Sequence, residues 1–566
     1  MLLNHSGVRR NTRVAFVTAA SLILSLWVFT WAARTRDAGY QQHVLSYPTP
    51  AQAHHPIDDL IRSAQTSHKR ALAERTHNVA DGAAAYRRRR GRDPPPGFDR
   101  WYARALREDA VIVESFFDQI YEDLGPFYGL KPSQVREAME GWEWMLRVRG
   151  GKVVEPKGKR FRKKIWAQMV RRFASELPVM DLPLNVLDEA RVVVPREEVD
   201  GLMAGAGLDG PRAREVDGYA GKAHWITSGP IWDLVRETCP STAEARSSDD
   251  SEAYPANLTT LRDPCIHREL AEMHGALIEP STLSVTQDLV PIFSDSKIPG
   301  YNDILLPPAS YHSSDPLFGS ANSWWPWSAG FSSVPWQSKK SGVVWRGKAT
   351  GGAARPGTWK KLHRQRLVSM LNASDIAGQL ADRGNLDFAG QAFLDAPPES
   401  VSAWLKDTAD VGFTDLLCSS TCEAMSSAYK LVPSINMKDQ YSWKYLLDID
   451  GNGHSGRFRA FLLSNSAVMK ATVFKEWHDS RLVPWVHYIP INMDLNGLWA
   501  TMAYFVGFGE TGAHDAAGRR IAVEGKEWAE KVLRKSDMEL YAYRLLLEYA
   551  RLCDERRESL GYTADL

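Results

Sequence analysis

Hydrophobic and polar residues follow two different periods along this chain, and each period predicts one kind of element. Apolar positions spaced by three and four residues predict helices over 101–149, 157–172, 359–371, 457–463 and 524–552. Short apolar runs predict strands at 191–194, 289–293, 343–345, 445–449 and 485–489. Strands that alternate with helices are typical of parallel sheets, so we expect an α/β fold. The Trp-rich stretch 323–327 is the boundary expected between two α/β halves.

The longest apolar segment lies near the N-terminus. Residues 14–33 carry no charge over about the length that crosses a bilayer, and three arginines precede them. Because the more positive flank stays in the cytosol, we expect 1–13 to be a cytosolic tail and 14–33 a transmembrane signal-anchor. The body would then be lumenal. A cleaved signal peptide is the alternative, although its apolar core would be shorter.

The rest of the chain divides into three expected parts. Residues 34–85 are polar and predict a stem that holds the body away from the membrane. The ranges 86–330 and 331–566 are the two expected α/β domains. The chain has 566 residues, so more than one domain is expected. Its net charge of +1 argues against a nucleic-acid partner. Its 20 tryptophans suit either sugar binding or an ordinary aromatic core.

Two further features agree with a lumenal body. Asn257 and Asn372 each begin an Asn-x-Ser/Thr glycosylation sequon. In an oxidising compartment the cysteines suggest two disulfides, Cys239–Cys265 and Cys418–Cys422, with Cys553 free. A zinc site at Cys418 and Cys422 is the alternative, but no second Cys/His pair with suitable spacing lies nearby.

Two glycine-rich loops follow predicted strands. In the first, Asp448-Ile-Asp-Gly-Asn-Gly-His-Ser-Gly-Arg457 leads into a helix whose N-terminus would attract an anion, with Ser455 as a cap and Arg457 as a cation. Asp448 and Asp450 could instead hold a divalent ion, but turn or cap roles are favoured. In the second loop, Arg346 and Lys348 could neutralise a diphosphate. Elsewhere, Asp188 ends an apolar run and is a candidate general base.

These segments resemble glycosyltransferase family 90, which includes fungal capsule-associated xylosyltransferase-like proteins and animal protein O-glucosyltransferases. The resemblance rests on 86–98, 180–195, 290–304, 345–347, 444–458 and 484–490. It implies a GT-B architecture, in which two Rossmann-like domains face a cleft. It also implies inverting transfer from a UDP-sugar without an essential metal or other cofactor.

Carried over to this chain, the resemblance makes Asp188 the catalytic base and 331–566 the UDP-sugar domain, with 86–330 on the acceptor side. The donor site would comprise Arg346, Gly347, Lys348, Asn452, Gly453, His454, Ser455, Gly456 and Arg457. Leu187 and Ala190 differ from the animal pattern, which affects acceptor recognition more than chemistry.

The expected enzyme transfers xylose, or next glucose, from the UDP-sugar to a glycan or glycoprotein, such as a fungal capsule or cell-wall polysaccharide. The absence of a Lys-Asp-Glu-Leu ending, together with the anchor, predicts a single-pass type II protein of the Golgi membrane. Two alternatives are an inactive glycan-binding relative and a metal-dependent GT-A transferase that uses Asp448 and Asp450.

Overall fold

A computed structural model describes residues 55–158, 160–205, 223–241, 254–256, 258–313, 334–371, 396–418, 420–509 and 512–564. Within it, Pro56–Leu566 form one compact unit. The predicted anchor 14–33, the boundary stretch 323–327 and both sequon asparagines lie outside the described residues. Among the described helices, none combines the length and apolarity needed to cross a membrane.

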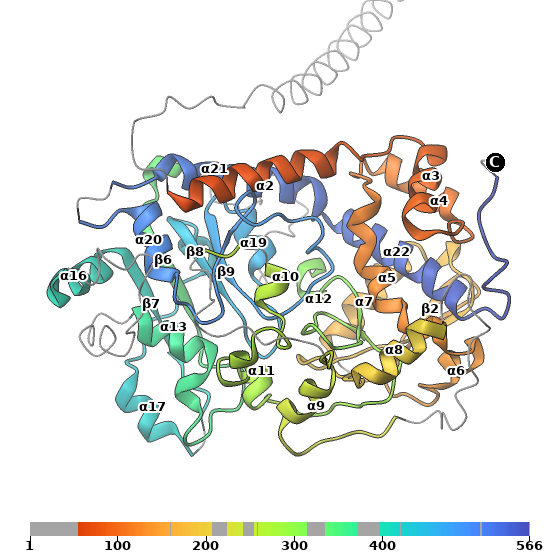
Figure 1. Ribbon diagram of the computed structural model, residues 1–566, viewed down its shortest axis with the longest axis horizontal. Coiled ribbons are helices and arrows are strands. Elements are labelled where there is room, and N and C mark those ends of the chain that lie inside the picture. Colours follow the sequence, from red (N-terminus) through yellow and green to blue (C-terminus); the bar gives the residue numbers. More distant parts are fainter. Residues whose placement is uncertain are drawn as a thin grey trace, which may run out of the picture. The chain divides into compact units, whose positions relative to one another are not determined.

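A five-stranded parallel sheet lies in the C-terminal half, which confirms the α/β prediction (Figure 1). Its strands, in spatial order, are β10 (Ile489–Pro490), β9 (Ala467–Ala471), β8 (Trp443–Ile449), β6 (Lys340–Lys348) and β7 (Ala409–Asp415). Every residue of β9 is buried, as expected for a central parallel strand with both faces covered. The predicted strands at 343–345 and 445–449 are therefore confirmed, whereas 485–489 contributes only the start of β10.

Helices pack around this sheet. They include α13 (His363–Leu371), α16 (Pro398–Thr408), α19 (Phe458–Leu462), α20 (Leu498–Val506) and α21 (Asp515–Val532). The helix predicted over 524–552 is interrupted: α21 ends at Val532 and α22 runs from Lys535 to Leu552. Arg534 is extended, and its backbone N–H donates to the Asp537 carboxylate at 2.8 Å, which caps the new helix. This break lets α22 leave the sheet and pack on α4 (Phe98–Arg107), α5 (Asp118–Leu124) and α7 (Phe161–Arg171) (Figure 1).

Among the described residues, the N-terminal half contains less parallel sheet than the C-terminal half, so a second Rossmann-like domain is not shown. Its described strands are β1 (Met145–Arg149), β2 (Lys152–Val154) and β3 (Met180–Pro183), which form an antiparallel sheet, and the short parallel pair β4 (Phe293–Ser294) and β5 (Ile304–Leu305). Leu184 pairs with Phe293 and so joins the two groups. The described residues thus show a mixed α/β fold with one large parallel sheet.

Two local predictions for this half were wrong. The last part of the helical pattern over 101–149 is instead the strand β1, which Gly150 and Gly151, both with positive φ, connect to β2 as a hairpin. The strand predicted at 191–194 makes only one bridge, from Val192 to Thr286. The backbone N–H groups of Arg191 and Val192 donate to the buried Asp303 carboxylate at 2.8–3.0 Å. In a longer strand these groups would instead donate to the backbone of a neighbouring strand.

Part of the segment expected to be a stem is folded onto the body. Residues 56–72 form α2 (Pro56–Leu72), whose Ile57 and Ile61 are buried. The imidazole of His68 contacts the ring of Trp528 on α21, with ring centroids 4.8 Å apart, and α2 lies alongside α21 (Figure 1). The segment is polar on average, so its narrow apolar face is not visible in its composition.

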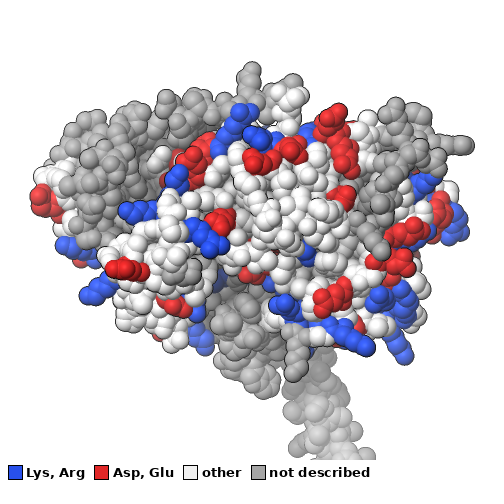
Figure 2. Space-filling model, turned by 90° about the horizontal axis from the view of Figure 1, so that it is seen from below, with Lys and Arg blue, Asp and Glu red and all other residues white. Residues whose placement is uncertain are grey.

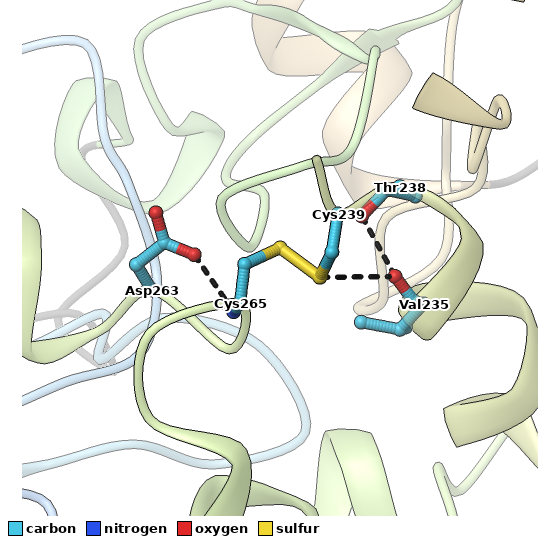
Figure 3. Close-up of a disulfide and its surroundings, with 5 residues drawn as sticks. All are labelled: Val235, Thr238, Cys239, Asp263 and Cys265. Carbon is cyan, nitrogen blue, oxygen red and sulfur yellow. Dashed lines mark hydrogen bonds between the residues drawn. A yellow bond between two sulfur atoms is a disulfide. The ribbon is translucent and has the colours of Figure 1, made fainter. Parts of the chain in front are cut away.

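The structure joins Cys239 to Cys265 and Cys418 to Cys422, the same two pairs that the sequence suggests. Around the first disulfide, the Cys265 backbone N–H donates to Asp263 and the Thr238 hydroxyl to the Val235 carbonyl (Figure 3). On the face shown in Figure 2, basic and acidic residues are interspersed rather than gathered into one basic patch.

Candidate functional site

The first glycine-rich loop, 450–457, connects β8 to α19 and is called the donor loop below. It turns sharply, since the Gly451 N–H donates to the Gly453 carbonyl at 3.0 Å. The residue that caps α19 is Arg457 rather than Ser455. The buried Ser455 hydroxyl instead donates to the carboxylate of Asp448 at the end of β8, which fixes the loop to its strand.

The carboxylates of Asp448 and Asp450 turn into the protein. Their side chains are 0% and 1% exposed. Asp448 pairs with Lys470 at 2.9 Å, and Asp450 accepts the Val473 N–H at 2.8 Å. This geometry agrees with the turn-and-cap interpretation of the Asp-x-Asp pattern and offers no exposed acidic pair to a substrate-bound ion.

The second loop, 349–352, meets the donor loop. The side-chain oxygen of Asn452 accepts the backbone N–H of Gly351 at 3.0 Å and that of Gly352 at 3.4 Å. It also accepts the Ser281 hydroxyl at 2.8 Å. One asparagine thus joins both loops, which lie at the carboxyl ends of neighbouring parallel strands, to a segment of the N-terminal half.

The guanidinium of Arg346 is bound to neighbouring residues of the protein and does not face these loops. It is 9% exposed, pairs with the Asp410 carboxylate, and donates to the carbonyls of Asp410 at 2.7 Å and Pro433 at 3.2 Å. The cation predicted to hold a diphosphate is therefore bound within the sheet. Lys348 is largely exposed and pairs with Asp415 at 3.0 Å. Gly347 packs so closely on the Trp345 ring that a Cβ would lie 2.6 Å from it.

Two other arginines lie beside Trp345 between the loops. The guanidinium carbons of Arg364 and Arg457 are 5.5 and 5.7 Å from the Trp345 ring centroid. Arg457 donates to the Arg346 carbonyl at 2.7 Å. Arg364 donates to the carbonyls of Asp450 at 2.7 Å and Lys348 at 2.9 Å. These partners are carbonyl oxygens, so no carboxylate among them neutralises either cation directly.

The electrostatics of this arginine pair favour an anion. Burial, followed by the charge of Arg457, lowers the pKa of Arg364 to about 9. Burial also lowers the pKa of Arg457. Two partly buried like charges destabilise one another, and a diphosphate between them would relieve that repulsion. Sequence reasoning missed Arg364, because it lies on a helix sixteen residues after Lys348 and has no motif of its own.

Asp188 lies on a turn of the N-terminal half. The Asn185 side chain shapes this turn, accepting the Leu187 N–H at 3.0 Å and donating to the Glu189 carbonyl at 2.7 Å. The Asp188 side chain is 47% exposed and receives a hydrogen bond of 2.6 Å from Arg162. Arg162 also binds the buried Asp295, and these two carboxylates raise its pKa. Arg162 belongs to the helix α7.

The predicted base and the donor loop are in contact. A Cβ at Gly453 would lie 2.4 Å from the backbone carbonyl oxygen of Asp188, so only glycine fits there. Gly453 has no left-handed φ, and the close approach alone explains the residue type. Of the neighbouring loop residues, His454 has a buried Nε2 and an edge contact to Tyr311, and Gly456 is half-buried. The structure therefore brings Asp188 and the loop 452–457 together.

Glu189 is a second carboxylate next to Asp188, in a different environment. It is 8% exposed, accepts the Thr282 N–H at 3.1 Å, and lines a small apolar cavity with Ile298 and Tyr301. Burial, with a smaller effect from the charge of Asp188, raises the pKa of Glu189 to about 7. Of the two carboxylates, the exposed Asp188 is the one accessible to an incoming hydroxyl.

Comparison with known proteins gives one family and several relatives. Residues 277–559 match the family described as Glycosyl transferase family 90. Protein O-glucosyltransferase 2 of Danio rerio is 29% identical over 123 residues, which cover 22% of this chain and 23% of that protein. The O-glucosyltransferase rumi homolog of Aedes aegypti is 32% identical over 128 residues, covering 22% and 30%. Protein O-glucosyltransferase 1 of Homo sapiens is 30% identical over 120 residues, covering 21% and 29%. The matches thus span less than a third of each relative.

Proposed function

The chain belongs to glycosyltransferase family 90, and from this premise we propose that it transfers a sugar from a UDP-sugar to a hydroxyl group of a protein or glycan. The donor would bind where the loop 349–352 and the donor loop meet. The acceptor would approach from the side of the N-terminal half that carries Asp188. The observation that supports this proposal is the close approach of Gly453 to the backbone carbonyl of Asp188, because the segment that carries this half-exposed side chain then contacts the donor loop.

Binding of the diphosphate is assigned to Arg364 and Arg457. Negative charge grows on the departing UDP as the bond to the sugar breaks, and fixed cations aimed at that charge lower the barrier. Arg346 has a supporting role in this proposal, because its backbone carbonyl holds Arg457 in place while its side chain binds β7.

Asp188 is the proposed general base. It would remove the proton from the acceptor hydroxyl as that oxygen attacks the anomeric carbon, which inverts the configuration through an oxocarbenium-like state. Arg162 would hold the carboxylate in position through its hydrogen bond. No metal or other cofactor is required in this scheme, which agrees with the inward orientation of Asp448 and Asp450.

The sugar, the acceptor and the location complete the proposal. The relatives are named O-glucosyltransferases, which favours glucose over xylose as the first donor to test and a protein as the acceptor. A GT-B arrangement, with 86–330 and 331–566 facing a cleft, remains part of the proposal. So does a type II position in the Golgi membrane with a lumenal body, which the two disulfides support.

The test is release of UDP from a panel of UDP-sugars by the wild-type chain and by Asp188→Asn. We expect the variant to lose transfer by about 10³-fold or more while it binds UDP as before, since general-base groups contribute about 10²–10⁴-fold. Asp233→Asn, a surface change, is the matched control. Transfer by Asp188→Asn at the wild-type rate would refute the assignment of the base.

Two alternatives predict different outcomes in the same assay. An inactive glycan-binding relative would release no UDP even as the wild-type chain. A metal-dependent transferase that uses Asp448 and Asp450 would stop when EDTA is added. We expect activity that continues in EDTA when it is measured well below the melting temperature of the EDTA-treated chain.

A further inference from the structure

Three buried side chains from separate parts of the chain converge next to the donor loop. His274 precedes the short helix α11 (Gly275–Ile278), His363 begins α13, and Asp450 follows β8. Their exposed fractions are 0%, 1% and 1%. One nitrogen or oxygen atom from each lies within 4.8 Å of the other two. The His274 Nε2 and Asp450 Oδ2 atoms are 3.3 Å apart.

Several polar atoms of this cluster have no hydrogen-bond partner. They are the Nε2 atom of His274, both ring nitrogens of His363 and the Oδ1 atom of Asp450. Buried polar atoms in proteins are almost always paired, because leaving them unpaired is costly. So many unpaired polar atoms in one place, with at least one lone pair on each of the three residues, call for a common partner.

We propose that His274, His363 and Asp450 bind a divalent cation of the zinc type. Two imidazole nitrogens and one carboxylate oxygen are a donor set that zinc favours. Zinc bond lengths of about 2.0–2.2 Å place tetrahedral ligand atoms roughly 3.3 Å apart, which the His274–Asp450 pair already matches. The three ligand atoms lie up to 4.8 Å apart, so the His363 ring would have to move slightly toward the other two residues to bind the ion.

A hydrogen-bonded pair is the competing explanation for two of the three residues. His274 Nδ1 accepts the Ala276 N–H at 3.2 Å, and in that tautomer Nε2 carries a proton that it can share with Asp450. A metal at Nε2 would move the ring proton to Nδ1 and replace this capping bond. The pair alone leaves both nitrogens of the buried His363 without a partner, and a metal would take the lone pair of one of them.

The charges around the cluster bear on affinity. Arg364 donates to the Asp450 carbonyl, and the nearby Lys470 ammonium interacts with the Asp450 charge. Both positive charges oppose a metal ion near this carboxylate, so we expect weaker binding than at a site without them. A bound ion would connect α11, α13 and the start of the donor loop. It would be structural and would not touch the substrate, so this site does not depend on the proposed transfer reaction.

The test begins with metal content. The full-length chain, purified without chelator, is analysed by mass spectrometry of its metals, stripped with EDTA, and titrated with Co²⁺. We expect about one zinc per chain, a lower melting temperature after stripping, and the visible absorption bands of Co²⁺ in a tetrahedral site. No bound metal and no Co²⁺ bands in the stripped chain would overturn the proposal.

Two variants separate a metal from a hydrogen-bonded pair. His363→Leu should lose the metal and lower the melting temperature if the site is real. Without a metal it should leave that temperature unchanged or raise it, because two unpaired nitrogens disappear. His274→Gln keeps an N–H donor for Asp450 and should lose the metal but preserve a simple pair. His224→Leu, at an exposed position, is the control. Equal Co²⁺ binding by wild type and His363→Leu would also overturn the assignment.

Discussion

Replacing Gly453 by alanine perturbs only the contact between the donor loop and the proposed base. The new Cβ would lie 2.4 Å from the Asp188 carbonyl oxygen and 3.3 Å from its carbonyl carbon. Real Cβ atoms essentially never approach closer than 3.0 Å, so the two segments must separate by at least about 0.6 Å. Both contacts are to backbone, which cannot rotate away as a side chain can. Because Gly453 has no left-handed φ, alanine adds no dihedral strain.

The size of the effect follows from that displacement. A misplacement of about 1 Å can cost roughly 100-fold in rate, so we expect kcat/KM to fall about 10- to 100-fold, or about 1.4–2.7 kcal/mol of transition-state stabilisation. Overpacking also costs about 1–3 kcal/mol of stability, so the variant should remain folded at 25 °C, with a somewhat lower melting temperature.

The assay is steady-state UDP release with varied donor, together with a melting curve. Gly201→Ala is the control, since a Cβ there meets open space and its φ is ordinary. If Gly453→Ala is folded and retains wild-type kcat/KM, the position of Asp188 against this loop does not matter for the reaction. The reasoning from close approach would then be wrong.

Three further predictions concern charge, pH and covalent links. Arg364→Lys keeps the charge but loses the planar fork, so the donor KM should rise about tenfold; the melting temperature should fall as well, because the carbonyls of Asp450 and Lys348 lose a donor; an unchanged KM would remove Arg364 from the donor site. The folded-state pKa of Glu189, about 7, lies above its ordinary 4.5, so the folded state holds a proton that the unfolded state releases. The stability that this group contributes should therefore be lost as the pH rises from about 4.5 to 7. The free energy of unfolding, measured with denaturant at pH 5 and pH 8, should differ less between the two pH values in Glu189→Gln than in the wild type. An equal difference in both proteins would contradict the prediction. Removing the 26-residue Cys239–Cys265 link with two serines should lower the free energy of unfolding by about 3.5 kcal/mol, and an unchanged denaturation midpoint would count against it.

Local patterns predicted much of the C-terminal half. The apolar runs at 343–345 and 445–449 are central strands of the parallel sheet, and a glycine-rich turn does follow β8. These features depend on neighbouring residues, so periodicity and turn chemistry reveal them. The same methods failed at 145–149, where the apolar spacing predicted helix but the chain forms β1 and pairs with β2 across Gly150 and Gly151.

The candidate site was predicted only in part, because its chemistry depends on orientation. The types of residue at 188, 346 and 452–457 indicate a base and an anion-binding loop. Whether a guanidinium faces a ligand or a neighbouring strand is decided by what packs beside it. Asp410 and Pro433 bind the side chain of Arg346, and the same packing leaves Arg364 and Arg457 beside Trp345.

By itself, then, the sequence determined the α/β class, the glycine-rich loops and the resemblance that led to the family. Tertiary structure decided which residues meet: Gly453 against Asp188, Asn452 between two loops, and α22 across the N-terminal half. The physical reason is range. Backbone preference and hydrophobic period act over a few residues, whereas close approach, burial and charge pairing join positions that are hundreds of residues apart in the chain.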